Sequence, residues 1–371
     1  MYTSRGINTT TTSGATMLEE LKTLIKFHPT TSDQNAVSAV LDHISAKLTA
    51  KDFTVERIIH EGIHSLYAST RGQKHAKVML QGHIDVVPGG EDFNMDGDKI
   101  YGRGSFDMLF GIASFLSYIE QLNNPADYDL SILLTGDEEI GGRNGVYQIL
   151  NDDGYTCDIC ILPDGGDHLG AICVASKGIN HFRLRIPGAS HHGSRPWEGD
   201  GAGNKAAKLL HDISELFDLG DPYNSTVTIS QLEAGNAALN QGPNEAYVGM
   251  DIRYKDEQDA ERIRARLDEI FRKYEAEVVF EERGRSFSLN TDTPLVKEFI
   301  DTYNRHIGEP VTFMRSHGSS DARHFDEKGI PVIMFRPDGG NAHGDDEWLS
   351  YSSWQKFHDI LTDYIETTAK Q

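Results

Sequence analysis

The chain has 371 residues and a formal net charge of −22, because 57 Asp and Glu residues outnumber 35 Lys and Arg residues. Its 38% hydrophobic and 25% charged residues match an ordinary globular protein and exclude disordered, collagen-like and disulfide-framework chains. The acidic excess argues against nucleic-acid and anionic-membrane partners, and three cysteines, an odd number, fit a reducing compartment. We therefore expect a cytoplasmic protein with a substantial core, built as two domains or one large one.

The first residues are rich in Thr and Ser and contain no apolar segment of the kind found in signal peptides. No run in the chain approaches the roughly 18 apolar residues of a membrane span. We expect residues 1–16 to be a disordered tail. The spacing of apolar residues then predicts a first helix over 17–27 and a second over 33–49.

Four short apolar runs are each followed by a polar, acidic or Gly-rich loop. Helical patterns lie between them, notably over 111–121 and 145–151. Strands that alternate with helices indicate an α/β sheet, and open sheets of this class bind ligands at the carboxyl ends of their strands. The predicted strands are 77–80, 130–134, 159–162 and 332–335.

The middle of the chain follows a different order, strand-helix-strand-strand-helix-strand. This βαββαβ order is the ferredoxin-like pattern. We therefore expect residues 179–286 to form a second domain, inserted between the two parts of the first, 17–178 and 287–371. The elements expected inside it are 179–188, 202–217, 225–233, 245–254, 257–274 and 276–283.

Several polar residues lie just past the predicted strand ends, and each alone has an ordinary structural explanation. His83 and Asp85 form an H-x-D that could be no more than a loop His beside a loop Asp. Asp107 precedes a helical run and could be its N-cap. Asp164 could belong to a plain Pro-Asp-Gly turn. The Asp-Glu-Glu run at 137–139 could be a solvated acidic turn.

Taken together, the residues suggest a metal centre. Two imidazoles and three carboxylates make a nitrogen and oxygen donor set suited to zinc, cobalt or manganese. Two divalent cations and three carboxylates would be balanced by one bridging hydroxide, which is the charge pattern of a two-metal hydrolase. Glu138 then remains as a general base beside a metal ligand. The five candidate ligands are His83, Asp107, Glu139, Asp164 and His343.

At this point the sequence resembles a known family, the co-catalytic zinc amidohydrolases. That family includes acetylornithine deacetylase, succinyl-diaminopimelate desuccinylase, glutamate carboxypeptidase, aminoacylase and several aminopeptidases and dipeptidases. The matching segments run in family order over nearly the whole chain from about Met17. They are GHIDVVP (82–88), GRGSFDM (102–108), TGDEEIGG (135–142), LPD (162–164), ASHHGSRP (189–196), GSSDAR (318–323) and HGDDEW (343–348).

The resemblance implies a mixed-sheet zinc-peptidase domain with an inserted ferredoxin-like lid and dimerisation domain. It implies that two metal ions are bound, one by His83 and Asp164 and the other by Glu139 and His343, with Asp107 as the bridge. It assigns Glu138 as the base and Asp85 as the partner of His83.

For the lid, the resemblance implies a homodimer in which His192 enters the partner subunit's site to polarise the scissile carbonyl. Asn240 matches a substrate-contacting Asn of the family, and Arg253 matches an Arg that often meets a substrate carboxylate. A strand-end salt bridge is the alternative for Arg253, because exposed ion pairs are common.

One departure from the family pattern stands beside the bridging carboxylate. The family usually continues with Lys-Gly after Asp-Met, where this chain has Leu109 and Phe110. The change either narrows the site or repacks the start of a helix. It also supplies the only support for a non-catalytic binding protein on the same scaffold.

Cys157 and Cys160 have the spacing of a thiol motif, but they fall in a predicted buried strand and are expected to be core residues.

We therefore predict a metal-dependent hydrolase that cleaves an amide bond of a small N-acyl amino acid. The alternative within the family is an aminopeptidase or dipeptidase. In family terms, Asp rather than Glu at position 164 favours acetylornithine-type deacylases or aminopeptidases and dipeptidases over desuccinylases and carboxypeptidases. The length of the chain, without a large lid extension, favours a deacylase over a dipeptidase.

Overall fold

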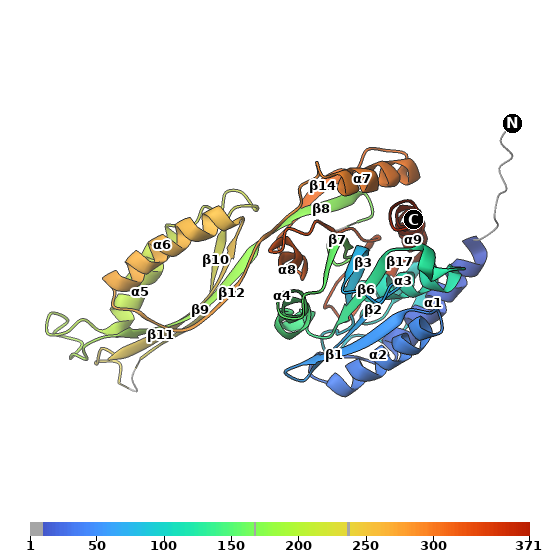
Figure 1. Ribbon diagram of the computed structural model, residues 1–371. Coiled ribbons are helices and arrows are strands. Elements are labelled where there is room, and N and C mark those ends of the chain that lie inside the picture. Colours follow the sequence, from blue (N-terminus) through green and yellow to red (C-terminus); the bar gives the residue numbers. More distant parts are fainter. Residues whose placement is uncertain (1–9, 167, 236–237) are drawn as a thin grey trace. The chain divides into compact units, whose positions relative to one another are not determined.

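The computed structural model describes residues 10–166, 168–235 and 238–371, and the chain divides into two compact units. Unit 1 contains residues 1–174, 289–314 and 320–371, and unit 2 contains residues 175–288 and 315–319 (Figure 1). The sequence placed the inserted domain at 179–286, so the expected boundaries and the unit boundaries lie within a few residues of each other. Within the described residues, no helix is long and apolar enough to cross a membrane.

Helix α1 (Thr10–Ile25) begins seven residues before the predicted start at Met17. The tail predicted over 1–16 is therefore wrong for residues 10–16, and residues 1–9 lie outside the described part. Thr and Gly are weak helix formers, so residues 10–16 carry no helical pattern. Tertiary packing overrides that propensity: Gly14 is buried, and a Cβ on it would lie 2.6 Å from the Tyr351 hydroxyl.

A six-stranded mixed sheet forms the centre of unit 1, in the order β1-β2-β6-β3-β7-β15. β6, β3, β7 and β15 run parallel, whereas β1 and β2 form an antiparallel hairpin that pairs with β6. The four strands predicted from the apolar runs are these four parallel strands, so their carboxyl ends meet at one edge. The sheet contains β1 (Thr54–His60), β2 (Ile63–Ser69), β3 (His75–His83), β6 (Leu130–Thr135), β7 (Thr156–Ile161) and β15 (Val332–Ile333).

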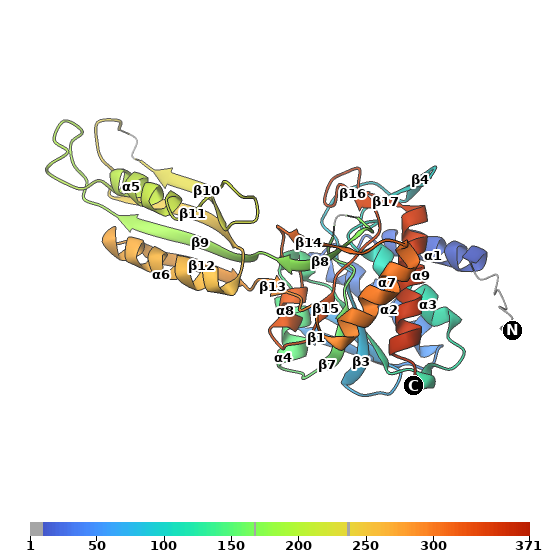
Figure 2. The same cartoon turned by 90° about the horizontal axis from the view of Figure 1, so that it is seen from above.

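Helices cover both faces of this sheet (Figure 1, Figure 2). The helices α1, α2, α3 and α9 lie on one side, and α4 and α8 lie on the other. β6 is buried along its whole length because both of its faces are covered. The remaining helices of unit 1 are α2 (Gln34–Thr49), α3 (Leu109–Gln121), η1 (Pro125–Asp127), η2 (Glu138–Ile140), η3 (Arg143–Tyr147), α4 (Gln148–Asn151), α7 (Pro294–Ile307), α8 (Ala322–Asp326) and α9 (Tyr351–Thr368).

Two smaller sheets complete the strand inventory of the described chain outside the ferredoxin-like sheet. One has the order β16-β17-β5-β4, and the other has the order β13-β8-β14. Their strands are β4 (Asn94–Asp96), β5 (Lys99–Tyr101), β16 (Gly339–Gly340), β17 (Trp348–Ser350), β8 (Ala171–Ser176), β13 (Phe287–Ser288) and β14 (Thr312–Ser316). The β5–β17 pair matters for function because it brings the segment before α3 close to the loop before β17.

Unit 2 has the predicted βαββαβ order and the antiparallel strand order β10-β11-β9-β12 of a ferredoxin-like sheet. Helices α5 and α6 lie on one face of this sheet (Figure 2), and their apolar residues pack with those of β9 and β11 into a separate core. The elements are β9 (Gly178–Pro187), α5 (Ala202–Ser214), β10 (Thr226–Ala234), β11 (Glu245–Tyr254), α6 (Glu257–Lys273) and β12 (Glu277–Gly284).

Candidate metal centre

Three neighbouring parallel strands deliver candidate ligands to the same edge of the unit 1 sheet. His83 is the last residue of β3, and Glu139 lies in the short helix η2 that follows β6. Asp164 comes three residues after the end of β7. Since β6, β3 and β7 are adjacent and parallel, these three side chains leave the sheet side by side.

The other two candidate ligands come from outside the large sheet. Asp107 lies two residues before α3, at the end of the Gly-rich segment 102–108. His343 lies in the loop between β16 and β17 and has a φ of 66°, which is uncommon for a residue other than Gly. A hydrogen bond of 2.9 Å from the Asn341 side chain to Asp346 spans this loop on either side of His343.

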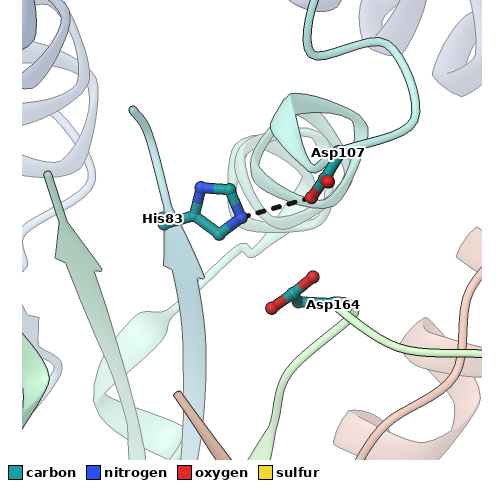
Figure 3. A group of neighbouring side chains, drawn as sticks. All are labelled: His83, Asp107 and Asp164. Carbon is teal, nitrogen blue, oxygen red and sulfur yellow. Dashed lines mark ion pairs between the residues drawn. The ribbon is translucent and has the colours of Figure 1, made fainter. Parts of the chain in front are cut away.

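The structure brings all five predicted ligands together in two overlapping groups. His83, Asp107 and Asp164 form one group, and Asp107, Glu139 and His343 form the other, with the ligand atoms of each group within 4.8 Å of one another. Figure 3 shows the first group, with the carboxylate of Asp164 beside the ion pair of His83 Nε2 and Asp107 Oδ1 at 3.4 Å. His343 Nε2 lies 3.2 Å from Asp107 Oδ2 and 3.1 Å from Glu139 Oε2. Asp107 is shared by both groups, as expected of a bridging ligand.

The chemistry of this donor set fits divalent cations. Nε2 of His83 and Oε1 of Glu139 are buried and have no hydrogen-bond partner among the described residues. Buried polar atoms without partners are costly, and a cation would satisfy both. Burial, with the nearby carboxylate of Asp107, raises the pKa of Asp164 to about 8. The carboxylates therefore repel one another in the protein without metal.

Ion pairs with histidine offset part of the repulsion between the carboxylates. Contacts with Asp107 and Glu139 raise the pKa of His343 to about 10. Burial alone would raise the pKa of Asp107, but the close imidazole groups of His343 and His83 outweigh burial and lower that pKa. Without metal, the imidazolium groups take the place that cations would otherwise fill.

Asp85 connects the two strand ends that carry His83 and the Glu138-Glu139 pair. The Nδ1 atom of His83 lies 2.9 Å from the Asp85 carbonyl oxygen and 3.6 Å from its carboxylate. The Asp85 carboxylate accepts hydrogen bonds from the Thr31 hydroxyl at 2.7 Å and from the backbone N–H groups of Glu138 and Glu139 at 3.2 and 3.3 Å. With Nδ1 engaged by Asp85, Nε2 of His83 is the atom that faces the other ligands.

Glu138 begins helix η2 next to Glu139. Burial, with the nearby carboxylate of Asp164, raises its pKa well above the ordinary range. It is absent from both groups of potential metal ligands in the described residues. A carboxylate that lies beside the ligands without joining them has the placement required of a general base.

Glu347 is a buried residue of this site that the sequence reasoning missed. Its carboxylate accepts hydrogen bonds from Arg103 Nη1 at 2.7 Å and from the backbone N–H groups of Gly104, Phe106 and Asp107 at 3.0, 2.8 and 2.9 Å. Glu347 thus fixes the loop that presents Asp107. The only signal in the sequence was its position at the end of the GDDE run, which by itself is typical of an exposed turn.

The predicted lid residues lie in unit 2 and show local contacts. His192 is exposed, and its Nδ1 contacts the Ser194 hydroxyl at 2.8 Å and the Ser194 backbone N–H at 3.2 Å, so Nε2 is the ring nitrogen that faces away from Ser194. Asn240 is exposed, and its carbonyl oxygen accepts from the Gly193 N–H at 2.6 Å. Arg253 donates to both carboxylate oxygens of Asp251, at 2.8 and 3.1 Å, which is the strand salt bridge considered as its alternative.

The departure at Leu109 and Phe110 repacks the start of α3. Both side chains are fully buried, and the Phe110 ring packs edge-on against Phe357 of α9 at 5.4 Å. Cys157 and Cys160 both lie in β7, where they are buried and form no disulfide, as predicted for core cysteines. Burial raises the pKa of both thiols, which makes them poor nucleophiles.

Comparison with known proteins decides the family. The sequence profile described as Peptidase family M20/M25/M40 matches residues 79–367, which is more than half of the chain. The chain belongs to peptidase family M20/M25/M40. Membership confirms the predicted family, the predicted fold class of a mixed-sheet catalytic domain with a lid domain, and the use of divalent metal.

Curated relatives of this M20/M25/M40 protein extend over nearly its full length. Succinyl-diaminopimelate desuccinylase of Nautilia profundicola is 27% identical over 369 residues, which cover 94% of this chain and 99% of the relative. The enzyme of the same name from Novosphingobium aromaticivorans is 29% identical over 335 residues, covering 84% and 88%. These relatives and the family confirm the prediction of a metal-dependent hydrolase that acts on amide or peptide bonds.

Solved structures agree on the fold. A tripeptidase from Staphylococcus aureus has a TM-score of 0.81 at 20% identity, covering 96% of this chain and 99% of that chain. Aminopeptidase PepT from Bacillus cereus has a TM-score of 0.79 at 18% identity, with the same coverage. At these identities the likeness concerns the fold.

Proposed function

We propose that this protein is a di-metal deacylase that cleaves a small N-acyl amino acid. The observation that carries the proposal is the pair of ligand groups that share Asp107. His83 and Asp164 would hold one cation, and Glu139 and His343 the other. Zinc suits this mixed nitrogen and oxygen set best, and cobalt or manganese are the alternatives. When bound, the cations polarise the scissile carbonyl and lower the pKa of the attacking water.

The chain's own residues supply the proton transfers. Glu138 would take a proton from the attacking water and return it to the leaving amine. Its raised pKa in the metal-free protein reflects burial and nearby carboxylates, and cations in both groups would offset that repulsion. Asp85 would fix the positions of His83 and of the Glu138-Glu139 backbone relative to each other. It contacts His83, both of these backbone N–H groups and the Thr31 hydroxyl.

The proposed oxyanion donor is His192, acting across a homodimer that forms through unit 2. Ser194 occupies Nδ1, so Nε2 is the ring nitrogen that would donate to the developing oxyanion. Asn240 and Arg253 would contact the substrate from the same unit. To do so, Arg253 would exchange its bond with Asp251 for one with a substrate carboxylate.

The proposed substrate is a small N-acyl amino acid, and the reaction takes place in the cytoplasm. The three cysteines are buried and form no disulfide, which agrees with that location. Two observations point in different directions on the substrate. The curated relatives are named desuccinylases, whereas Asp164 favoured other deacylases or peptidases in family terms. The fold neighbours are named peptidases, so an aminopeptidase or dipeptidase activity is the second candidate.

A substrate panel with metal-loaded protein tests the proposal. Zinc-loaded protein should hydrolyse at least one N-acyl amino acid faster than any dipeptide or tripeptide. Chelation should abolish this activity, and zinc or cobalt should restore it. Faster cleavage of peptides would replace the deacylase with the peptidase. Metal binding without hydrolysis of any member of a broad panel would favour a non-catalytic protein on this scaffold.

A further inference from the structure

Arg336 lies three residues past β15 and is held by the segments that carry two of the metal ligands. Its guanidinium carbon lies 4.0 Å from the centroid of the Phe106 ring, and Phe106 precedes Asp107 in the chain. Its Nε donates a hydrogen bond to the carbonyl oxygen of Gly166, two residues after Asp164. The guanidinium is therefore anchored beside the group formed by His83, Asp107 and Asp164.

The Phe106 ring, on which the Arg336 guanidinium stacks, is itself held in a fixed position. Phe106 is 3% exposed, and its backbone N–H is bound by Glu347. Its ring fills the space over Gly339, where an added Cβ would lie 2.2 Å from a ring carbon. A planar guanidinium stacked on a buried ring keeps a defined orientation, unlike a side chain that extends freely into water.

The terminal nitrogens of Arg336 have unused hydrogen-bonding capacity. In the part of the chain that the structure describes, neither Nη1 nor Nη2 donates a hydrogen bond, and Arg336 forms no ion pair with a carboxylate. Arg103, in the same region, is fully engaged by the Glu347 carboxylate and by the carbonyl oxygens of Gly89 and His343. Arg336 is partly exposed, so a ligand can reach it.

The charge of the site gives this arginine a further significance. Arg336 is close enough to Asp107 and Asp164 for its positive charge to act on both carboxylates. In the protein without metal it offsets their repulsion. Two divalent cations would offset that repulsion more strongly, so in the metal-loaded protein the two carboxylates would depend less on Arg336. The guanidinium charge would then be available to attract a negatively charged ligand.

We propose that Arg336 forms an anion-binding subsite beside the metal centre and selects substrates that carry a second carboxylate. A guanidinium fork matches a carboxylate through two parallel hydrogen bonds, which gives both affinity and orientation. The inference rests on the proposed function, because the subsite would act on the substrate of that reaction. The carboxylate belongs either to the acyl group or to the leaving amino acid.

Two matched pairs of substrates separate these cases. N-succinyl and N-butyryl derivatives of one amino acid have acyl chains of equal length and differ by a terminal carboxylate. Dipeptides that end in Glu or Gln make the same comparison on the leaving side. The wild-type protein should prefer the charged member of one pair. Arg336→Met should reduce kcat/KM for that member by about 10²-fold and leave the neutral member within about threefold.

Other variants control for charge and folding. Arg336→Lys keeps the charge but loses the fork and should recover part of the preference. Arg71→Met removes the same charge from a surface residue that pairs with Asp129 at 3.4 Å, near the opposite ends of the strands, and should change neither substrate. If Arg336→Met reduces both members of the pair equally, or if wild-type protein shows no preference for the charged member, the inference is wrong.

A binding measurement provides a readout that does not depend on turnover. Succinate and butyrate can each place one carboxylate on the metals, but only succinate has a second one for Arg336. Calorimetry on zinc-loaded wild type should show succinate binding at least about tenfold tighter, with the difference lost in Arg336→Met. Equal binding of the two acids by wild type would overturn the subsite. If this preference is found but no substrate is hydrolysed, the subsite stands and the proposed function fails.

Discussion

In unit 1 the five predicted metal ligands come from separate segments and meet within two groups that share Asp107. In unit 2 the backbone segments of His192 and Asn240 are hydrogen-bonded to each other, but the predicted functional side chains do not meet in one group within the described residues. His192 and Asn240 are exposed, and Arg253 is paired with its strand neighbour Asp251. The same sequence reasoning thus located side chains that converge on one site in unit 1 and side chains without a common target in unit 2.

The difference follows from how each unit fixes its polar residues. Parallel strands end at a common edge, so residues just past those ends have little choice of position. The loop of 188–196 in unit 2 is tied by backbone hydrogen bonds to residues 240–242, and within the described residues the His192 side chain contacts its neighbour Ser194 rather than another predicted functional residue. We infer that unit 1 completes the metal-binding chemistry by itself, whereas unit 2 needs a ligand or a second subunit to give its residues a common target.

The largest expected effect lies in unit 1. Glu138→Ala should lower kcat by about 10²–10⁴-fold, because it removes the proton acceptor for the attacking water. Its zinc content should stay at the wild-type level, since Glu138 is absent from both ligand groups. His83→Ala is the contrasting variant and should lose metal. Steady-state kinetics with metal analysis measures both, and loss of most zinc from Glu138→Ala would contradict the assignment of the base.

The next effect tests unit 2. His192→Ala should lower kcat by about 10²–10³-fold with little change in KM and no loss of zinc, because the proposed donor acts on the transition state. His211→Ala provides a matched control, since it removes another exposed histidine of the same unit. An unchanged kcat in His192→Ala would reduce His192 to an ordinary loop residue.

The action of His192 across a dimer has its own test. Mixed Glu138→Ala and His192→Ala subunits should regain activity, because some heterodimers pair one intact base with one intact lid histidine. Labelled subunits would show whether exchange has taken place. If exchange occurs without recovery of activity, or if the protein is a strict monomer, the proposal that His192 acts in the partner subunit's site is wrong.

A smaller effect on metal affinity or turnover is expected from Glu347, which supports the loop of Asp107. The Glu347 carboxylate now accepts hydrogen bonds from backbone N–H groups. Glu347→Gln would place an NH₂ group against some of these donors, and the loop that carries Asp107 would shift as a result. We expect zinc affinity or kcat to fall by about 10–100-fold. Asp345→Asn removes the same charge from an exposed residue of the loop between β16 and β17, two residues before Glu347, and should have no effect. Competition with a fluorescent chelator measures the affinity; equal values in both variants would rule out this role.

The positions of the metal ligands could be predicted because each follows a strand end or a Gly-rich turn in a motif that the sequence displays. Their supporting residues could not. Glu347 acts on backbone groups about 240 positions away, and Thr31 reaches Asp85 from the start of the chain. Neither contact leaves a local pattern, since it depends on tertiary approach. The Arg253–Asp251 pair was within reach of prediction, because residues i and i+2 of a strand share a face.

The fold shows a similar division. Long apolar periodicities placed the elements of unit 2 almost to the residue, because α5 and α6 each bury one regular stripe. The start of α1 was missed because its stability comes from contacts with other helices rather than from helix-forming residues. Sequence patterns thus located what is fixed locally or by strand ends, and missed what is fixed by distant contacts.

The smallest effect expected concerns the stability of the metal-free protein at different pH values. Asp164 has a pKa of about 8 in the folded protein and 3.8 ordinarily, so between these values the folded state binds more protons than the unfolded chain. The free energy of unfolding therefore falls as the pH rises through this range. His343, with a pKa of about 10 against 6.5, acts in the same direction, because its favourable charge is lost as the pH rises.

In excess chelator, the Tm should decrease by a few degrees between pH 6 and pH 9. Zinc replaces the protons, so the increase in Tm that it produces should grow over the same range. Asp164→Asn should flatten the dependence in chelator, because its amide does not titrate, and should weaken the gain from zinc at pH 9. Differential scanning calorimetry at fixed ionic strength measures each Tm. A constant Tm in chelator, or an unchanged slope in Asp164→Asn, would show that the carboxylates of unit 1 do not repel one another as their burial requires.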